Sequence, residues 1–201
     1  MRVKMETLRG KHTWDLVKSP PGVNIMDLMW VYDIKWDREG NQIKDKVRVV
    51  GKGYTQQLGV DYNETWAGVT CLESVQMTAA ITAKFNLKLW CINFVGAYLN
   101  SLTKEDIYMR QPEGFVEPRY EDYICKLIHT IYSTMQGVHN WYETLSATFN
   151  IGYTTSCVDP CLQFKKENGN YAITDTYTDD VVGASNTEEE GNKRKKEIGD
   201  K

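Results

Sequence analysis

Long apolar runs are missing from this 201-residue chain. No segment approaches the roughly 18 to 20 uninterrupted apolar residues that span a bilayer, so we expect no membrane partner. The first residues, Met1 to Glu6, include several charged side chains, which excludes the apolar core of a secretion signal. The sequence therefore predicts an intracellular protein, cytoplasmic or nuclear, that is not secreted. It does not specify an oligomeric state.

Cysteine and histidine are also scarce. The five cysteines are an odd number without the spacing of a disulfide scaffold, which fits a reducing compartment. Cys157 and Cys161 lie four residues apart, but the three histidines are scattered and no second pair has zinc spacing. We therefore interpret both cysteines as buried free thiols rather than as zinc ligands.

An excess of positive charge is missing as well. The formal net charge is −3, which argues against a strongly basic nucleic-acid-binding protein. Residues 1–58 nevertheless carry 11 Lys and Arg against 7 Asp and Glu. Six of these cations form a local basic ribbon: Lys35, Arg38, Lys44, Lys46, Arg48 and Lys52. Such a ribbon can bind phosphates even in an acidic protein, and it can equally be a solvated strand face.

The remaining composition is that of an ordinary globular protein, with 41% apolar and 25% charged residues. Helical and strand patterns are mixed along the chain. We expect helices at 1–9, 72–85, 138–150 and 188–196. We expect strands at 13–17, 30–36, 42–54, 87–92, 107–110, 124–127, 171–177 and 181–184. The second and third of these strands, joined by a turn at 37–41, predict a long hairpin that carries the basic ribbon.

The expected helices differ in how apolar and charged residues are distributed over their faces. The helix at 138–150 has an apolar face made of Trp141, Leu145 and Phe149. The helix at 72–85 begins near Ser74, and its apolar residues include Val75, Ala79 and Ile81. The stretch 188–196 follows a cap at Asn186-Thr187, and its acid-before-base order predicts a solvent-facing helix.

The run Tyr177-Thr178-Asp179-Asp180 lies between the last two expected strands, at the turn of a hairpin. Two adjacent carboxylates at a tight turn concentrate negative charge, which is costly unless a cation binds there. Paired carboxylates that bind Mg²⁺ are characteristic of nucleotidyl-transfer sites, where two ions contact the attacking and leaving oxygens. Taken alone, an Asp-Asp pair in an exposed turn is more often a solvated turn.

Further motifs occur in a defined order along the chain. They are Thr13–Val17, Lys46–Gln56, Gly59–Thr65, Ala97–Asn100, Ile107–Phe115, Trp141-Tyr142, Asp159–Leu162 and Tyr177–Asp180. In this order and spacing, from about residue 3 to about residue 185, the chain resembles the reverse transcriptase domain of copia-type LTR retrotransposon polyproteins. One motif alone would carry little weight, whereas the ordered set is specific.

The resemblance implies an α+β fold with the fingers and palm of a right-hand polymerase, the palm being an antiparallel sheet backed by helices. It implies one reverse-transcriptase-like domain over 1–201. Within it, about 25–70 would be the fingers hairpin region, about 71–185 mostly palm with interleaved fingers elements, and 186–201 a charged C-terminal tail or helix. The thumb and RNase H regions of the family have no counterpart here, so we expect a truncated domain.

The resemblance also implies a nucleotide site. Arg48 would contact the triphosphate of the incoming dNTP, with Lys46 nearby, because a guanidinium binds phosphate in a bidentate manner. Tyr98 would lie under the sugar, and Gln136 would pack on the sugar and base. The alternatives are core packing for Tyr98 and a surface ion pair for Arg48. An RNA or DNA template–primer would be the macromolecular partner.

At the catalytic centre the resemblance implies Mg²⁺ or Mn²⁺ on Asp179, with Asp180 in a supporting role. The family's first catalytic aspartate corresponds to Asn93, which offers a neutral carbonyl and an amide donor in place of a charge. We therefore expect weakened metal binding. Asp175 would add a third carboxylate near Asp179 or would face solvent, and the sequence leaves both open.

Another departure lies at Ile131–Gln136, which lacks the glycine and the lysine of the family's Leu-Tyr-Gly-Leu-Lys-Gln-like run. The chain is thus expected to be an RNA-directed DNA polymerase domain by ancestry, inactive or very weak as an enzyme. The alternatives are a non-catalytic nucleic-acid-binding module and a degenerate retroelement fragment.

Overall fold

The computed structural model describes residues 1–150 and 152–199. The chain divides into two compact units, each built from two separate stretches of sequence. Unit 1 comprises Met1–Trp66 and Tyr98–Asn140, and unit 2 comprises Ala67–Ala97 and Trp141–Lys201. None of the described helices combines the length and the apolarity needed to cross a membrane.

Unit 1 contains a four-stranded sheet in the order β1-β7-β6-β2. These strands are β1 (Trp14–Lys18), β2 (Ile25–Met26), β6 (Tyr108–Met109) and β7 (Tyr123–Leu127). Helix α1 (Arg2–Gly10) contributes Met5 and Leu8 to a core that also contains Met26, Val49, Met109 and Leu127. The helix at 1–9 and the strands at 13–17 and 124–127 are thereby confirmed.

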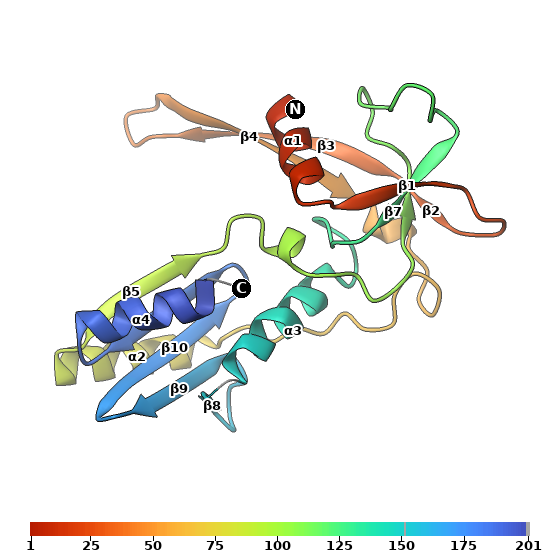
Figure 1. Cartoon of the computed structure of the whole chain (residues 1–201). Helices are drawn as coiled ribbons and strands as arrows, with labels where there is room; N and C mark the ends of the chain where they lie inside the picture. The colour runs from red at the N-terminus through yellow and green to blue at the C-terminus, as the bar shows by residue number, and fades with distance from the viewer. Residues whose placement is uncertain (151, 200–201) are drawn as a thin grey trace. The chain divides into compact units, whose positions relative to one another are not determined.

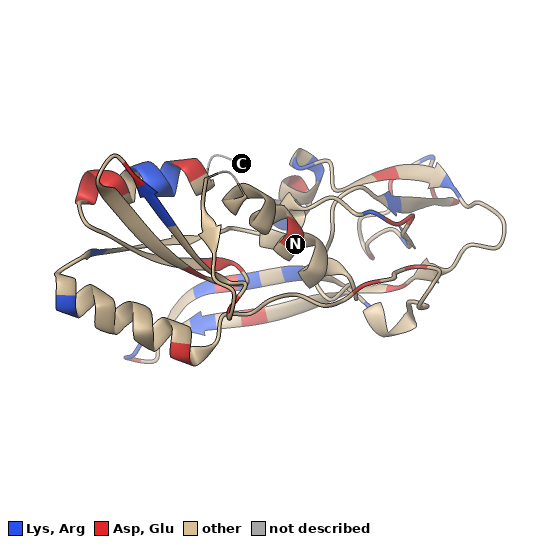
Figure 2. Cartoon of the chain, turned by 90° about the horizontal axis from the view of Figure 1, so that it is seen from below, with Lys and Arg blue, Asp and Glu red and all other residues tan. Residues whose placement is uncertain are grey.

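The predicted long hairpin is present in unit 1 as β3 (Leu28–Trp36) and β4 (Gln42–Gly51). The second strand ends earlier than expected, because Gly53–Thr55 form a short 3-10 helix. The two strands pair in antiparallel register, with Val31 opposite Arg48 and Asp33 opposite Lys46. Lys and Arg positions, blue in Figure 2, recur along this hairpin, so the basic ribbon follows a two-stranded scaffold.

Unit 2 contains a five-stranded antiparallel sheet in the order β5-β11-β10-β9-β8. Its strands are β5 (Lys88–Asn93), β8 (Thr154–Thr155), β9 (Leu162–Glu167), β10 (Asn170–Tyr177) and β11 (Asp180–Ser185). Gly183 of β11 lies against the indole of Trp90, and a Cβ there would lie 2.2 Å from a ring carbon. A side chain at this position would therefore clash with the indole, which would have to move.

Helices cover both faces of this sheet (Figure 1). Helix α4 (Glu188–Gly199) packs on the face of Trp90, where Gly191 allows close approach to the indole. The later part of α3 (Gly137–Phe149) buries Trp141, Leu145 and Phe149, as its apolar pattern predicted. Helix α2 (Leu72–Phe85) contacts β10 beside Asp175, whose register places it on the opposite face from Trp90.

The face that α2 presents to the sheet differs from the expectation. Its buried residues are Ser74, Thr78 and Thr82, whereas Val75 and Ala79 are exposed. This inward face is polar because it meets two buried carboxylates: Ser74 donates to Asp159, and Thr78 lies beside Asp175 on β10. The apolar pattern of 72–85 thus predicted the helix and its bounds but not its orientation.

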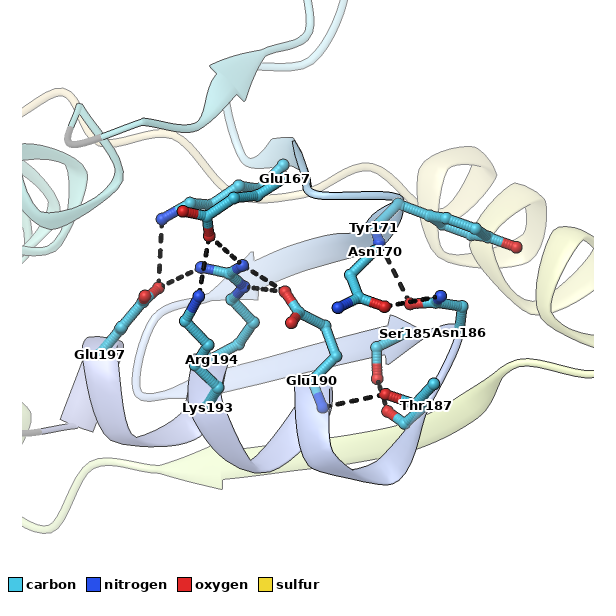
Figure 3. A network of polar contacts seen from close by, with 11 residues as sticks. Glu167, Asn170, Tyr171, Ser185, Asn186, Thr187, Glu190, Lys193, Arg194 and Glu197 are labelled. Atoms are coloured by element: carbon cyan, nitrogen blue, oxygen red, sulfur yellow. Dashed lines mark hydrogen bonds and ion pairs between the residues drawn. The ribbon is translucent and has the colours of Figure 1, made fainter.

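Helix α4 is not the solvent-facing helix that its charges predicted. Glu190, Arg194 and Ile198 are buried, and Arg194 is fully inaccessible to solvent. The Arg194 guanidinium donates to Glu190 and Glu197 on α4 and to Glu167 at the end of β9 (Figure 3). The predicted cap is present, since the Thr187 hydroxyl accepts the Glu190 N–H at 3.1 Å.

The cysteine interpretation is half right. All five cysteines are free thiols, and Cys161 is buried, but Cys157 is exposed. Burial raises the pKa of Cys161 to about 12, so this thiol stays protonated. The four-residue spacing therefore reflects no shared environment.

Candidate functional site

The Asp-Asp hairpin has the geometry that its sequence predicts. Tyr177 ends β10, Asp180 begins β11, and Thr178 and Asp179 form the two-residue turn between them. Thr178 has a φ of 52°, which is strained for a β-branched residue and of the kind that clusters at functional sites. Asp179 and Asp180 are both exposed at this turn.

Two aromatic side chains of unit 2 fix the turn. The indole N–H of Trp141 donates to the Thr178 carbonyl at 2.6 Å, and the ring of Phe94 lies edge-on to Trp141 at 5.0 Å. The Phe94 N–H donates to the Asp179 carbonyl at 2.8 Å. These contacts satisfy the backbone of a strained turn, so they determine where the carboxylates lie. Sequence reasoning assigned Trp141 to the core and missed this role.

Asn93 lies directly beside the carboxylates. It ends β5 opposite Asp180 in the antiparallel register, and its Nδ2 donates to Asp180 Oδ1 at 2.6 Å. Strand register therefore brings Asn93 next to the Asp-Asp run. The amide occupies one oxygen of Asp180 with a neutral donor, where a carboxylate would add charge and a second ligand.

This donor set does not fit a pair of divalent ions. Asp179 and Asp180 supply two negative charges at most, and Asn93 directs its amide N–H toward Asp180. Over residues 1–150 and 152–199, no three His, Cys, Asp or Glu side chains are grouped so that they could bind a metal ion.

The residues implied in nucleotide binding all lie in unit 1. Arg48 on β4 is within 6.0 Å of the centroid of the Tyr132 ring, and its guanidinium is 3.9 Å from Asp33. Tyr98 is half-buried and meets the same ring edge-on at 5.1 Å. Arg48 and Tyr98 therefore share one neighbour, Tyr132, which the sequence did not single out.

Gln136 is completely buried. Its amide N–H donates to the Asp61 carbonyl at 2.9 Å, and its oxygen accepts from Gln56 at 3.2 Å. Gln56 in turn accepts the N–H of Met135 at 2.8 Å. The amide of Gln136 thus ties the loop before α3 to the segment after β4.

Asp175 lies neither beside Asp179 nor in solvent. It is buried on β10, and one of its oxygens accepts from the Thr70 hydroxyl at 3.3 Å. Burial raises the pKa of Asp175, and the negative charge of Asp159 adds to the rise.

Asp159, in the Asp159–Leu162 motif, lies at the start of α2. Its carboxylate accepts the Ser74 hydroxyl at 2.5 Å, the Cys71 N–H at 3.1 Å and the Cys161 N–H at 2.8 Å. Burial opposes its ionisation, but these hydrogen bonds prevail and lower the pKa of Asp159 to about 2. The motif therefore has a structural role that connects α2 to the loop before β9.

Comparison with known proteins identifies the family. The family model described as reverse transcriptase (RNA-dependent DNA polymerase) matches residues 11–201. The chain belongs to the reverse transcriptase family. It is 31% identical over 179 residues to the Retrovirus-related Pol polyprotein from transposon RE1 of Arabidopsis thaliana, covering 88% of this chain. It is 30% identical over 184 residues, 90% of this chain, to the Retrovirus-related Pol polyprotein from transposon TNT 1-94 of Nicotiana tabacum.

These relatives are Pol polyproteins of copia-type elements, and the match confirms the resemblance seen in the motifs. The chain is also 32% identical over a shorter stretch of 90 residues to the Putative transposon Ty5-1 protein YCL074W of Saccharomyces cerevisiae. The chain spans 12% of the RE1 polyprotein and 14% of the TNT 1-94 polyprotein.

Proposed function

We propose that this chain is the fingers and palm of a copia-type RNA-directed DNA polymerase whose catalytic centre is impaired. Unit 1, with the β3–β4 hairpin of the 25–70 region, would be the fingers. Unit 2, with most of 71–185, would be the palm and would carry the Asp-Asp turn. The family supports this assignment, since its members would bind a template–primer and a dNTP.

The observation that carries the proposed impairment is the hydrogen bond from Asn93 to Asp180. Asp179 and Asp180 would bind Mg²⁺ or Mn²⁺ weakly, because the third carboxylate is replaced by an amide donor. Losing one charged ligand costs several kcal/mol of transition-state stabilisation, and each 1.4 kcal/mol is about tenfold in rate. We therefore expect nucleotide incorporation to be very slow or absent.

A primer-extension assay on an RNA template tests this proposal directly. We expect no incorporation above background with either Mg²⁺ or Mn²⁺. Efficient incorporation that disappears in Asp179→Ala would contradict the proposed impairment while supporting the assigned role of Asp179. The Asp179→Ala variant is an informative control because the Asp179 side chain is exposed, and the backbone carbonyl that accepts the Phe94 N–H is kept.

A second candidate function is nucleotide or nucleic-acid binding without catalysis. It is favoured by the basic hairpin, where Arg48 and Lys46 occupy the positions that the family motif predicts. Binding to a template–primer that weakens as salt increases and weakens further in Arg48→Ala would support it. No binding at low salt would leave a degenerate retroelement fragment as the better description.

A further inference from the structure

Lys4 lies outside the family motifs, but it belongs to a group of cations in unit 1. It is half-buried on α1, and its Nζ is 5.8 Å from the centroid of the Tyr132 ring. Arg48 approaches the same ring to 6.0 Å. One aromatic ring is therefore the common neighbour of two cations from separate elements, α1 and β4.

The charges around Lys4 are mutually repulsive. Burial lowers the pKa of Lys4, and the positive charges of Arg48, Lys11 and Lys46 lower it further. Counter-charge is sparse: over the described residues Lys4 makes no ion pair, and Arg48 has Asp33 at 3.9 Å. Lys11 is bonded to the neutral side chain of Asn100.

A cluster of this kind is unfavourable without an anion and favourable with one. Cations close together in a partly desolvated place repel each other more strongly than in water. A polyanion removes that repulsion and gains charge-assisted hydrogen bonds from each side chain. In the absence of an anion, cation–π contacts with the Tyr132 ring keep the Lys4 ammonium and the Arg48 guanidinium near each other.

We propose that Lys4 is a third cation of the polyphosphate site, binding the triphosphate of a nucleotide together with Arg48 and Lys46. This inference rests on the proposed function, in which unit 1 binds a dNTP. Lys4 is a binding residue that contacts the phosphates, and Tyr132 is the surface beneath it.

The test is calorimetric titration of the full chain with inorganic tripolyphosphate and with a dNTP at low salt. We expect Lys4→Met to weaken both affinities about fivefold, the effect of losing one charge contact near the surface. Lys4→Arg keeps the charge and should restore most of the affinity. Arg2→Met is the matched control, because Arg2 is an exposed cation on the same helix and is not among the charges that act on Lys4.

Thermal unfolding of the same variants separates binding from structure. Lys4→Met relieves the repulsion, so the ligand-free variant should melt at the same temperature as the wild type or higher. Weaker binding by a variant of unchanged or increased stability supports a ligand role. Weaker binding that accompanies a large loss of stability overturns it.

Other results of the binding titrations distinguish failure of the role assigned to Lys4 from failure of the proposed function. If Arg48→Ala weakens tripolyphosphate binding and Lys4→Met does not, the role of Lys4 is wrong and the nucleotide site remains. If the wild type binds neither tripolyphosphate nor the dNTP, both are wrong. If Lys4→Met changes affinity for a single-stranded oligonucleotide but not for tripolyphosphate, Lys4 contacts a nucleic-acid backbone and the inference is overturned.

Discussion

Asn93 donates a 2.6 Å hydrogen bond to the carboxylate of Asp180, at the paired ends of β5 and β11. Two neighbouring strands thus bring a neutral amide into contact with one of two adjacent carboxylates. In the proposed metal site, this bond would compete with a cation for the same Asp180 oxygen.

Replacing Asn93 with aspartate should therefore improve metal binding. We expect Asn93→Asp to bind Mn²⁺ at least about tenfold more tightly, because a carboxylate adds a charge and a bridging ligand. Titration followed by the Mn²⁺ electron paramagnetic resonance signal measures this. Asn93→Ala is the matched control: it removes the donor without adding charge and should bind far less well than Asn93→Asp. Equal affinities for the wild type and Asn93→Asp would contradict the expectation.

Arg194 should be a major contributor to the stability of unit 2. It is fully buried against Glu190, which is 4% exposed, and removing one partner of a buried pair leaves the other uncompensated. We expect Arg194→Met to lower the free energy of unfolding by about 3 to 5 kcal/mol. Urea denaturation measures the change.

Lys193 provides the comparison on the adjacent residue of α4. Its exposed ammonium is 2.9 Å from Glu167, which also pairs with Arg194. An exposed pair contributes about 1 kcal/mol or less, so Lys193→Met should have a small effect. Similar losses for the Arg194 and Lys193 variants would show that burial of the guanidinium is not what stabilises α4.

The two buried aspartates of unit 2 should affect stability in opposite directions. Asp159 has a pKa of about 2 in the folded chain, below its ordinary value of 3.8, so its contribution is present above about pH 4 and is lost as the pH falls toward 2. Asp159→Asn should cost about 2 kcal/mol at neutral pH and progressively less in acid.

Asp175 has a raised pKa, so its ionised form is disfavoured in the folded chain. This cost is present at neutral pH and disappears as the pH falls through the raised pKa and then the ordinary value. Asp175→Asn should therefore be neutral or stabilising at pH 7, and its advantage should shrink in acid. Chemical denaturation of both variants between pH 3 and pH 7 measures this, and parallel pH profiles would contradict the assignment.

Arg48 should dominate nucleotide binding by unit 1. Because a guanidinium binds phosphate through two N–H groups, Arg48→Lys keeps the charge but loses the geometry. We expect Arg48→Ala to weaken dNTP binding about tenfold and Arg48→Lys to restore only part of it. Fluorescence titration at two salt concentrations measures both. Full affinity in Arg48→Ala would mean that Arg48 is the surface ion pair with Asp33.

The sequence predicted most elements because their periodic patterns are local. Helix 72–85 was placed correctly, yet its inward face depends on distant carboxylates, since Ser74 donates to Asp159 and Thr78 lies beside Asp175. The burial of Arg194 likewise depends on Glu167 on β9, which no helical pattern reveals. Both errors concern which face of a helix is buried, and they share one cause. A polar residue becomes buried when a distant segment supplies its hydrogen-bond partner, and a helical pattern does not show that partner.

The parts of the candidate site that lie in sequence motifs could be predicted. The contacts that bring side chains from separate elements together could not. Asp179, Asp180 and Asn93 come together because strand register aligns them. The contact of Trp141 with the Thr178 carbonyl and the approach of Lys4 to Tyr132 join separate elements. A single sequence contains no signal for these contacts, because each side chain also fits a simple core or surface role.

The central claim is that Asn93 accounts for the proposed impairment of the catalytic centre in this reverse transcriptase domain. Primer extension on an RNA template, with wild type and Asn93→Asp compared at equal concentration and with Mn²⁺, tests it most directly. We predict no measurable extension by the wild type, and extension by Asn93→Asp that disappears when Asp179→Ala is added. Extension by the wild type at the rate of Asn93→Asp would contradict the claim.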